Sequence, residues 1–196
     1  MTSSFSSSLP STGGELTTDR LVLRPWSAEV IGAVLGGDRL AHWAEDFPAE
    51  GDRVIAGVIA AERDASNASD ASGGPGQDGH RLIVERESGR TVGSISLLLP
   101  PTDGALEIGY GVVASRRGRG LASEAARALV EFALASDDVH TVYADVELSN
   151  PASVRVSEKA GLRRWSEDAT TARFGVTDSG SDSGSAPAST SGSSGA

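Results

Sequence analysis

The sequence predicts one mixed α/β domain built on a central, mostly antiparallel sheet. The chain has 196 residues, a length that fits a single domain. Strand-like and helix-like hydrophobic patterns follow one another in the order β α α β β β α β α β β. Three successive strands are joined by turns, which favours an antiparallel meander, and the strand–helix–strand that follows favours a βαβ unit. A chain that combines both belongs to the mixed class.

Three segments have compositions that bury too little apolar surface to fold. Residues 1–14 are rich in Ser and Thr, residues 178–196 are rich in Ser, Gly and Ala, and both are expected to be disordered tails. Residues 65–79 have a similar composition and are expected to form a long flexible loop. The folded domain is therefore expected over residues 15–177.

The first part of the domain is predicted to hold one strand and two helices. Residues 20–24 (Arg-Leu-Val-Leu-Arg) form a short strand that Pro25 stops. Ser27 is the expected N-cap of a helix that runs to about Leu35 and ends at two glycines. A second helix is expected over residues 53–63 with Asp52 as its cap, because one helix face then carries Val54, Ile55, Val58 and Ile59.

The meander is predicted from three strands, over residues 81–87, 91–99 and 105–113. The first two flank Ser88-Gly89-Arg90, whose composition is typical of a hairpin turn. Pro100-Pro101 is expected to end the second strand, because proline cannot donate to a strand ladder. A three-residue turn leads into the third strand.

The last part of the domain is predicted to alternate helix and strand. A long helix over residues 120–135 has apolar residues at helical spacing, and a strand over 139–146 follows it. A helix over residues 152–160 has Asn150 as its capping residue and Pro151 near its first turn. Two weaker strands are expected last, over 162–166 and 171–176.

Charge and composition exclude several classes of function. The formal charge is 17 − 27 = −10, which disfavours non-specific binding to nucleic acid or to an anionic membrane. The chain has no cysteine, so disulfides, thiolate metal sites and a cysteine nucleophile are excluded. It has only three histidines, so no metal site is expected. No apolar run reaches the roughly 20 residues that span a bilayer, and the N-terminus lacks signal-peptide features. A cytoplasmic protein is expected.

The clearest local motif is the turn Ser115-Arg116-Arg117-Gly118-Arg119-Gly120-Leu121-Ala122, which follows a strand and opens a helix. Its glycines let the backbone approach a ligand, and several backbone N–H groups converge at the helix start. Three arginines add positive charge, so the turn predicts a site for a diphosphate or similar polyanion. The alternative is a solvated arginine-rich turn. The segment is not a Walker loop, because no Gly-Lys-Ser/Thr follows.

Five segments in order resemble the GNAT N-acetyltransferases. Arg117-x-x-Gly120-x-Ala122 resembles the family's acetyl-CoA pyrophosphate signature. Four more resemble the ribosomal-protein N-acetyltransferase-like (RimJ/RimL-type) branch, and these are residues 18–26, 92–95, 107–112 and 150–162. The resemblance covers about residues 16–176. It implies the GNAT fold, in which a mostly antiparallel sheet with splayed fourth and fifth strands is flanked by about four helices.

The resemblance also implies where acetyl-CoA binds. Its pantetheine arm would pair with the backbone of Tyr110, Gly111, Val112 and Val113 between the splayed strands. Its pyrophosphate would meet the amides of Arg117, Gly118, Arg119, Gly120, Leu121 and Ala122. Asn150 would contact the cofactor arm, or serve only as a helix cap. No metal is implied.

Within the family an amine attacks the thioester directly, which needs a base and a proton for the departing sulfur. Glu107 shares a strand face with Gly109 and Gly111, where a ligand has space, and is the candidate base. The alternative is a strand glutamate that pairs with an arginine. Ser153 matches a serine that donates to sulfur in this branch, or is a first-turn serine without a ligand. Ser157 stands where many members have a tyrosine acid, so the acid is Ser153, Ser157 or water.

The acceptor is expected to be a primary amine, either a protein N-terminus or a small molecule. Trp43, Glu45, Asp46 and Phe47 follow the first helix, where the family builds its acceptor pocket, and could bind a cationic amine. The alternative is that Trp43 and Phe47 pack locally against the second helix. The acidic balance also suits a cationic acceptor. A non-catalytic acyl-CoA-binding module is the alternative function, and the expected state is a monomer or a homodimer.

Overall fold

The computed structural model describes residues 14–68 and 79–178. Eight strands, four α-helices and one short 3₁₀ turn follow one another in these residues. They are β1 (Leu16–Thr17), β2 (Leu21–Pro25), α1 (Ala28–Gly36), α2 (Glu50–Ala68), β3 (His80–Glu85), β4 (Thr91–Thr102), β5 (Ala105–Val112), η1 (Ala114–Arg116), α3 (Leu121–Leu134), β6 (Thr141–Glu147), α4 (Pro151–Lys159), β7 (Arg163–Glu167) and β8 (Thr171–Thr177).

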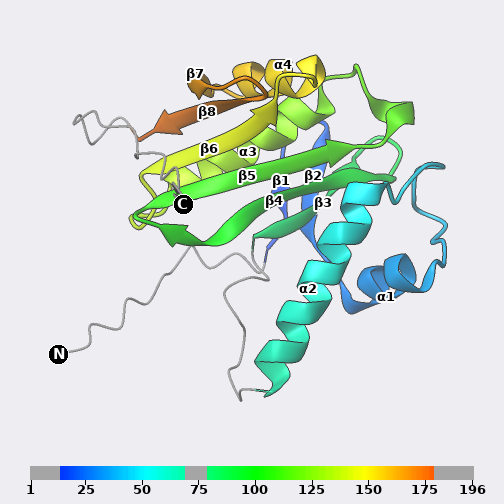
Figure 1. The fold of residues 1–196 in the computed structure, drawn as a ribbon. Helices are drawn as coiled ribbons and strands as arrows, with labels where there is room; N and C mark the ends of the chain where they lie inside the picture. The colour runs from blue at the N-terminus through cyan, green and yellow to red at the C-terminus, as the bar shows by residue number, and fades with distance from the viewer. Residues whose placement is uncertain (1–13, 69–78, 179–196) are drawn as a thin grey trace, which may run out of the picture.

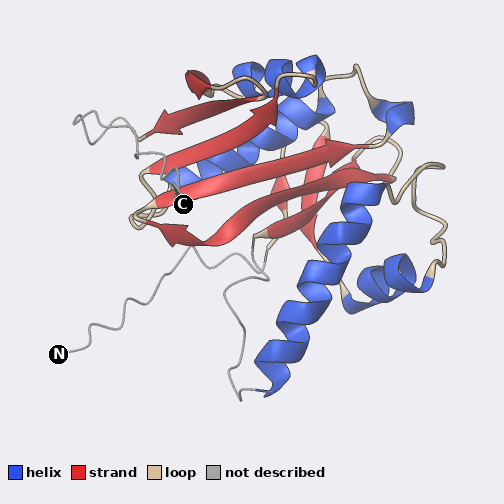
Figure 2. Cartoon of the chain, in the orientation of Figure 1, coloured by secondary structure: helices blue, strands red, loops and turns tan. Residues whose placement is uncertain are grey.

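The described strands form one sheet in the order β1-β2-β3-β4-β5-β6-β8-β7. Neighbouring strands are antiparallel except β5 and β6, which run parallel on either side of the crossover helix α3. Helices α1 and α2 lie on one side of the sheet, and α3 and α4 lie on the other (Figures 1 and 2). The predicted mixed α/β class with a meander and a βαβ unit is confirmed.

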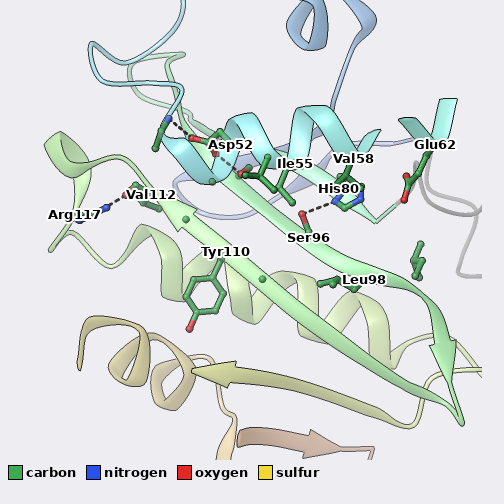
Figure 3. A pocket seen from close by; sticks show the side chains of 17 residues that line it. Asp52, Ile55, Val58, Glu62, His80, Ser96, Leu98, Tyr110, Val112 and Arg117 are labelled. Atoms are coloured by element: carbon green, nitrogen blue, oxygen red, sulfur yellow. Dashed lines mark hydrogen bonds between the residues drawn. The ribbon is translucent and has the colours of Figure 1, made fainter. Parts of the chain in front are cut away.

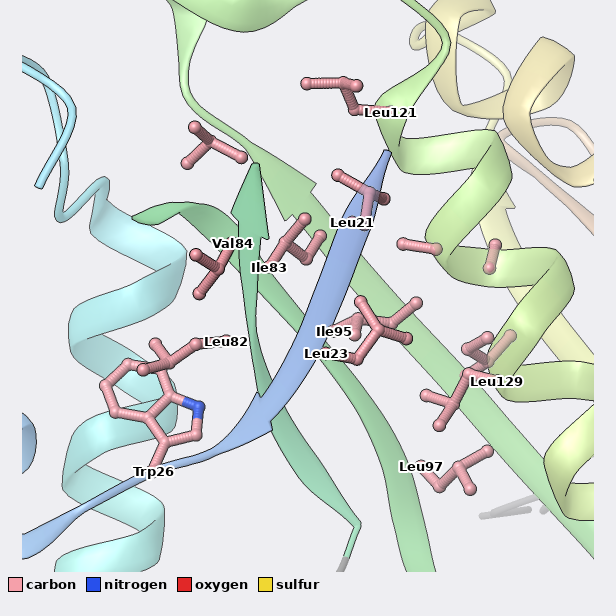
Figure 4. Close-up of a cluster of buried hydrophobic side chains, with 14 of the residues drawn as sticks. Leu21, Leu23, Trp26, Leu82, Ile83, Val84, Ile95, Leu97, Leu121 and Leu129 are labelled. Atoms are coloured by element: carbon pink, nitrogen blue, oxygen red, sulfur yellow. The ribbon is translucent and has the colours of Figure 1, made fainter. Parts of the chain in front are cut away.

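Part of the core lies between the sheet and α3. Figure 4 shows Leu23 of β2 and Ile95 of β4 facing Leu129 of α3, and all three are fully buried. Trp26 and Leu82 lie instead toward α2. The sheet is therefore packed against helices on both faces.

The N-terminal half differs from the sequence-based expectation at two places. β1 was not expected, and its two residues pair with Val22 and Leu23 of β2. α2 begins at Glu50, so Asp52 lies inside the first turn, where its Oδ2 accepts a hydrogen bond from the Ala49 amide (2.8 Å). The helix also continues through Ala68, into the segment 65–79 that was expected to be a loop. The rest of that segment except Gly79, the N-terminal tail except residue 14 and the C-terminal tail except residue 178 lie outside the described residues.

The prediction that Pro100-Pro101 ends the second meander strand is wrong. β4 continues to Thr102, and its register with β5 shifts between Leu98 and Thr102. Within the described residues, β3 and β4 pair as far as His80↔Ser96, and the Leu97 amide donates to the Gly79 carbonyl (2.8 Å). Both prolines lie beyond these contacts, in the stretch of β4 where the pairing with β5 is irregular. The other boundaries differ from expectation by one or two residues.

Candidate functional site

The strands β5 and β6 separate after a short paired stretch. They pair from Ala105↔Thr141 to Glu107↔Tyr143 and no further within the described residues. Beyond this point lies a space of about 240 Å³, which we call the strand gap. Residues 108–110 of β5 border it on one side, residues 144–147 of β6 border it on the other, and Asn150 and Ser153 lie at its end. This is the splay that the sequence resemblance implied.

A groove of about 400 Å³ runs from β5 along the glycine-rich turn to the first turns of α3 and α4. We call it the turn groove. Of the residues expected to bind the cofactor, those that line it are Tyr110, Gly111, Val112, Arg117, Gly118, Gly120, Leu121, Ala122 and Asn150, and the candidate acid Ser153 lines it too. Val113 is buried behind the groove. The Arg119 side chain is exposed and turns toward Glu85, outside the groove.

The backbone of the turn fits a bound diphosphate. Gly118 and Gly120 have φ values of 75° and 78°, in the left-handed region that favours glycine. Gly120 is also the N-cap of α3, so the turn ends at a helix N-terminus, where backbone N–H groups attract an anion. The lining includes the cationic residues Arg116, Arg117, Arg155 and Lys159. A Cβ at Gly118 would meet no atom of the described chain within 4 Å, which leaves that side of the turn open to a ligand.

Glu124, in the first turn of α3, holds the turn against the N-terminal strand. Its Oε1 accepts hydrogen bonds from Thr18 Oγ1 (2.5 Å) and the Arg20 amide (2.9 Å), and its Oε2 accepts one from Arg20 Nε (2.7 Å). Arg20 Nη1 also donates to the Arg119 carbonyl (2.9 Å). Burial raises the pKa of Glu124, but these bonds outweigh it and leave the pKa lowered. No sequence motif marked this contact, because its partners lie about a hundred residues apart.

Tyr110 connects β5 to α4 across the splay. Its hydroxyl donates to the Ser153 carbonyl (3.0 Å) and shares a second hydrogen bond with Ser157 Oγ (3.0 Å). Burial raises the pKa of Tyr110, and the contacts with Ser157 and Ser153 oppose that rise. Ser157 is fully buried and lies outside the lining of the turn groove, whereas Ser153 lines it. Where many family members have a tyrosine on α4, this chain brings a tyrosine hydroxyl from β5.

A second cavity of about 560 Å³ lies between α2 and the outer face of β4 and β5 (Figure 3). We call it the α2 cavity. It shares Tyr110, Gly111, Val112 and Arg117 with the turn groove. A Cβ at Gly109 or Gly111 would meet no atom of the described chain within 4 Å, so this part of β5 leaves room above its backbone. The two spaces therefore meet at one strand.

Two polar pairs face the α2 cavity, and sequence reasoning missed both. Ser94 Oγ donates to Asp52 Oδ1 (2.5 Å), and His80 Nδ1 is bonded to Ser96 Oγ (2.8 Å). Burial raises the pKa of Asp52 despite the bonds from Ser94 and Ala49, and it lowers the pKa of His80 against the opposing charge of Glu62. A cap-like aspartate and a strand-end histidine carry no motif that would have marked them.

Glu107, the candidate base, is half-buried on the same strand face as Gly109 and Gly111 but is not part of the cavity lining. It lies beside Tyr143, where the Asp145–Arg173 ion pair is also found. Burial and the Asp145 charge raise the pKa of Glu107, and Arg173 opposes them. A carboxylate with a raised pKa is suited to accept a proton near neutral pH.

The four residues expected to line the acceptor pocket lie outside the α2 cavity. Trp43 and Phe47 are buried, with ring centroids 5.0 Å apart in an edge-to-face contact. The Asp46 carboxylate accepts bonds from the Ser115 amide (2.8 Å) and hydroxyl (2.6 Å), which lowers its pKa and fixes the start of the turn. Glu45 is exposed. Residues 43–47 therefore contact the glycine-rich turn through Asp46 and lie outside the α2 cavity.

Comparison with known proteins gives the family. Residues 20–163 match the acetyltransferase (GNAT) domain family. Because this match covers more than half of the chain, the protein belongs to the GNAT acetyltransferase family. An uncharacterized N-acetyltransferase of Bacillus subtilis (strain 168), YjdG, is 33% identical over 82 residues. That alignment covers 41% of this chain and 49% of YjdG, so the chain matches about half the length of this curated relative.

Solved structures share the fold at low sequence identity. A GNAT-family acetyltransferase from Bacillus anthracis has a TM-score of 0.59 at 17% identity, over 84% of this chain and 98% of its own. RimL, a ribosomal alpha-N-protein acetyltransferase in complex with coenzyme A, has a TM-score of 0.57 at 14% identity, also over 84% and 98%. The predicted GNAT fold is confirmed.

Within residues 14–68 and 79–178, no three His, Asp or Glu side chains gather in a way that could hold a metal ion. In the same part of the chain, every helix is too short or too polar to cross a bilayer.

Proposed function

We propose that the protein transfers the acetyl group of acetyl-CoA directly to a primary amine. The observation that carries the proposal is the shared wall between the two spaces, because Tyr110, Gly111, Val112 and Arg117 border both the turn groove and the α2 cavity. A donor in the groove and an acceptor in the cavity would meet across β5. Direct transfer needs this kind of contact between two bound substrates.

The turn groove supports acetyl-CoA as the donor. Its diphosphate would lie against the backbone amides of residues 117–122, with the arginine side chains balancing its charge. The pantetheine arm would run along residues 110–113 toward the strand gap. Arg117 Nε now donates to the Val112 carbonyl (3.0 Å), so a pantetheine that pairs with this carbonyl would have to displace the arginine.

The proposed reaction needs no covalent enzyme intermediate. A neutral amine nitrogen forms a bond to the thioester carbonyl carbon, and the carbon–sulfur bond breaks with its electron pair on sulfur. One proton of the original ammonium goes to a base and a second goes to the sulfur, which leaves an N-acetyl amide and the CoA thiol. The chain has no cysteine that could carry the acetyl group instead.

Two residues keep the roles predicted for them. Glu107 is the proposed base and, since it lies outside the cavity lining, would act through water. Ser153 is the proposed donor to sulfur, and it lines both the strand gap and the turn groove. Asn150 caps α4 by accepting from the Ser153 amide (3.1 Å), so the asparagine positions the serine whether or not it also touches the cofactor.

Calorimetric titration with acetyl-CoA and with ATP tests the donor. We expect acetyl-CoA to bind and ATP to bind more weakly or not at all. Arg117→Ala should weaken acetyl-CoA binding by roughly tenfold or more, as expected for a charge-assisted contact. The exposed Arg163→Ala on β7 serves as the matched control. If acetyl-CoA does not bind, or if both variants bind equally, the proposal fails.

Release of free thiol on a panel of amines and peptides then tests transfer. Thiol release that depends on an added amine supports an enzyme. Acetyl-CoA binding without thiol release across the panel would support the alternative, a non-catalytic acyl-CoA-binding module.

A further inference from the structure

The α2 cavity has large apolar side chains in its lining that are exposed to solvent. Four large apolar side chains are markedly exposed among the described residues, and three of them line this cavity. Val54 is 60% exposed, Val58 is 41% exposed and Leu98 is 47% exposed. Exposed apolar groups that gather at a cavity of this size are typical of a site that a ligand covers. The ligand body that fits them is aliphatic.

Each end of the cavity carries a carboxylate. Asp52 lies in the first turn of α2 and Glu62 lies ten residues later, which is about 15 Å along the helix axis. The cavity has a similar length along the opposite strand, β4. Asp52 contacts Ser94, and Leu98 lies four residues further along β4, which is about 14 Å away. Figure 3 shows Asp52 and Glu62 at opposite ends, with Ile55 and Val58 between them. The cavity is therefore elongated, with an acidic group at each end.

The Asp52 end lies nearer the turn groove. Ser94, which binds Asp52, pairs with Gly111, and Gly111 borders both spaces. Paired residues in an antiparallel ladder have Cα atoms only about 5 Å apart. At the other end, Glu62 lies in the electrostatic range of His80, whose ring is held by Ser96. The strand gap, toward which the thioester would point, lies further along the ladder, because Gly109 pairs with Ser96 and the proposed base Glu107 pairs with Leu98. The amine that reacts across β5 is therefore the one at the Glu62 end.

We propose that the acceptor is an aliphatic amine with two positive charges, a diamine or longer polyamine. Its reacting ammonium binds Glu62, its methylene chain covers Val58 and Leu98, and its second ammonium binds Asp52. This inference rests on the proposed acetyl transfer. The net charge of −10 favours the encounter with a dication. A protein N-terminus fits less well, because a peptide backbone would place polar groups against the apolar middle.

Initial rates with three acceptors of different charge and polarity test the assignment: α,ω-diaminooctane, octylamine and an unacetylated peptide N-terminus. We expect kcat/KM for the diamine to exceed that for octylamine by roughly tenfold or more, with the peptide lowest. Glu62→Gln should raise KM for both amines and leave acetyl-CoA affinity unchanged. Asp52→Asn should raise KM for the diamine about tenfold and leave octylamine unaffected. Asp64→Asn, an exposed carboxylate on the same helix, is the matched control.

The outcomes separate this inference from the proposed function. If acetyl-CoA binds and some amine releases thiol, the proposed function stands. The inference is then overturned if octylamine or the peptide equals the diamine, or if Asp52→Asn affects octylamine and diamine alike. Absence of acetyl-CoA binding would remove both.

Discussion

The Tyr110 hydroxyl on β5 donates to the Ser153 carbonyl on α4, across the gap where β5 and β6 no longer pair. The ring thus spans the opening that a cofactor arm would enter. Its second contact is with the buried Ser157 hydroxyl, at the position where the sequence resemblance implied a tyrosine. One side chain therefore connects β5 to α4 across the gap.

Tyr110→Phe removes both hydrogen bonds and leaves the Ser157 hydroxyl buried without this partner. We expect a loss of about 1 kcal/mol in the free energy of unfolding, measured by urea denaturation. The chain has one other tyrosine, Tyr143, whose ring lies under Arg173. Tyr143→Phe keeps that ring and should cost less than about 0.5 kcal/mol. Equal losses in the two variants would contradict the bridging role.

Two glycines of the sheet should respond differently to alanine. A Cβ at Gly93 would lie 2.0 Å from the Gly111 carbonyl oxygen, so Gly93→Ala must push β4 from β5 and cost more than about 2 kcal/mol. A Cβ at Gly109 meets no described atom within 4 Å and points to the α2 cavity. Gly109→Ala should therefore fold normally but raise KM for the acceptor. Chemical denaturation and initial rates on both variants check the contrast.

Glu124→Gln should weaken the contact between the N-terminal strand and α3. The folded-state pKa of Glu124 is lowered from 4.5, so its contribution is present above that pH and is lost as the pH falls below it. At neutral pH we expect a loss of about 1 kcal/mol, a modest figure because Arg20 is half exposed. The difference in the free energy of unfolding between wild type and variant should become smaller below about pH 4. Glu131→Gln, exposed on the same helix, is the control. A difference in the free energy of unfolding that does not change with pH would contradict the stabilising role of the Glu124 carboxylate.

Asp52→Asn should stabilise the protein while it impairs the acceptor site. Asparagine can accept from the Ala49 amide and donate to Ser94, so it keeps both contacts without burying a charge. Burial raises the folded-state pKa of Asp52 above its ordinary value of 3.8. The free energy of unfolding of the wild type therefore falls, relative to that of the variant, as the pH rises from about 3.8 through the folded-state pKa. We expect a gain of up to about 1 kcal/mol at neutral pH. A variant less stable than wild type at pH 7 would contradict the prediction.

Glu107→Gln should lower kcat with little change in acetyl-CoA affinity. A positioned base contributes roughly a hundredfold or more, so we expect a loss of that size in initial rates. The exposed Glu158→Gln on α4 controls for the change in net charge. Unchanged turnover would remove Glu107 from the reaction and leave Asp52 as the carboxylate nearest the shared wall.

Local signals carried most of the fold. Ser27 caps α1 with a bond to the Val30 amide, Gly120 starts α3 in a left-handed conformation, and Asn150 caps α4, as their residue types predicted. The alternation in residues 105–113 predicted which residues share a face of β5. These features depend on neighbours within a few positions, so one sequence is enough to identify them.

Contacts between distant segments were decided only by the tertiary structure. Pro100 and Pro101 stay in β4, in the stretch where its register with β5 shifts between Leu98 and Thr102, which the proline pair itself does not reveal. Trp43 and Phe47 form core contacts, and the exposed carboxylate of Asp46 holds the turn.

The sequence by itself determined the family, the order of the elements and the turn for a polyanion, because each is a local pattern of glycines, charges and periodicity. The tertiary structure decided the rest of the candidate site. Asp52 meets Ser94, and Tyr110 meets Ser157, only because the sheet brings residues more than forty positions apart within hydrogen-bond distance. Such pairs leave no spacing rule along the chain, since their distance in space is set by how helices pack on the sheet.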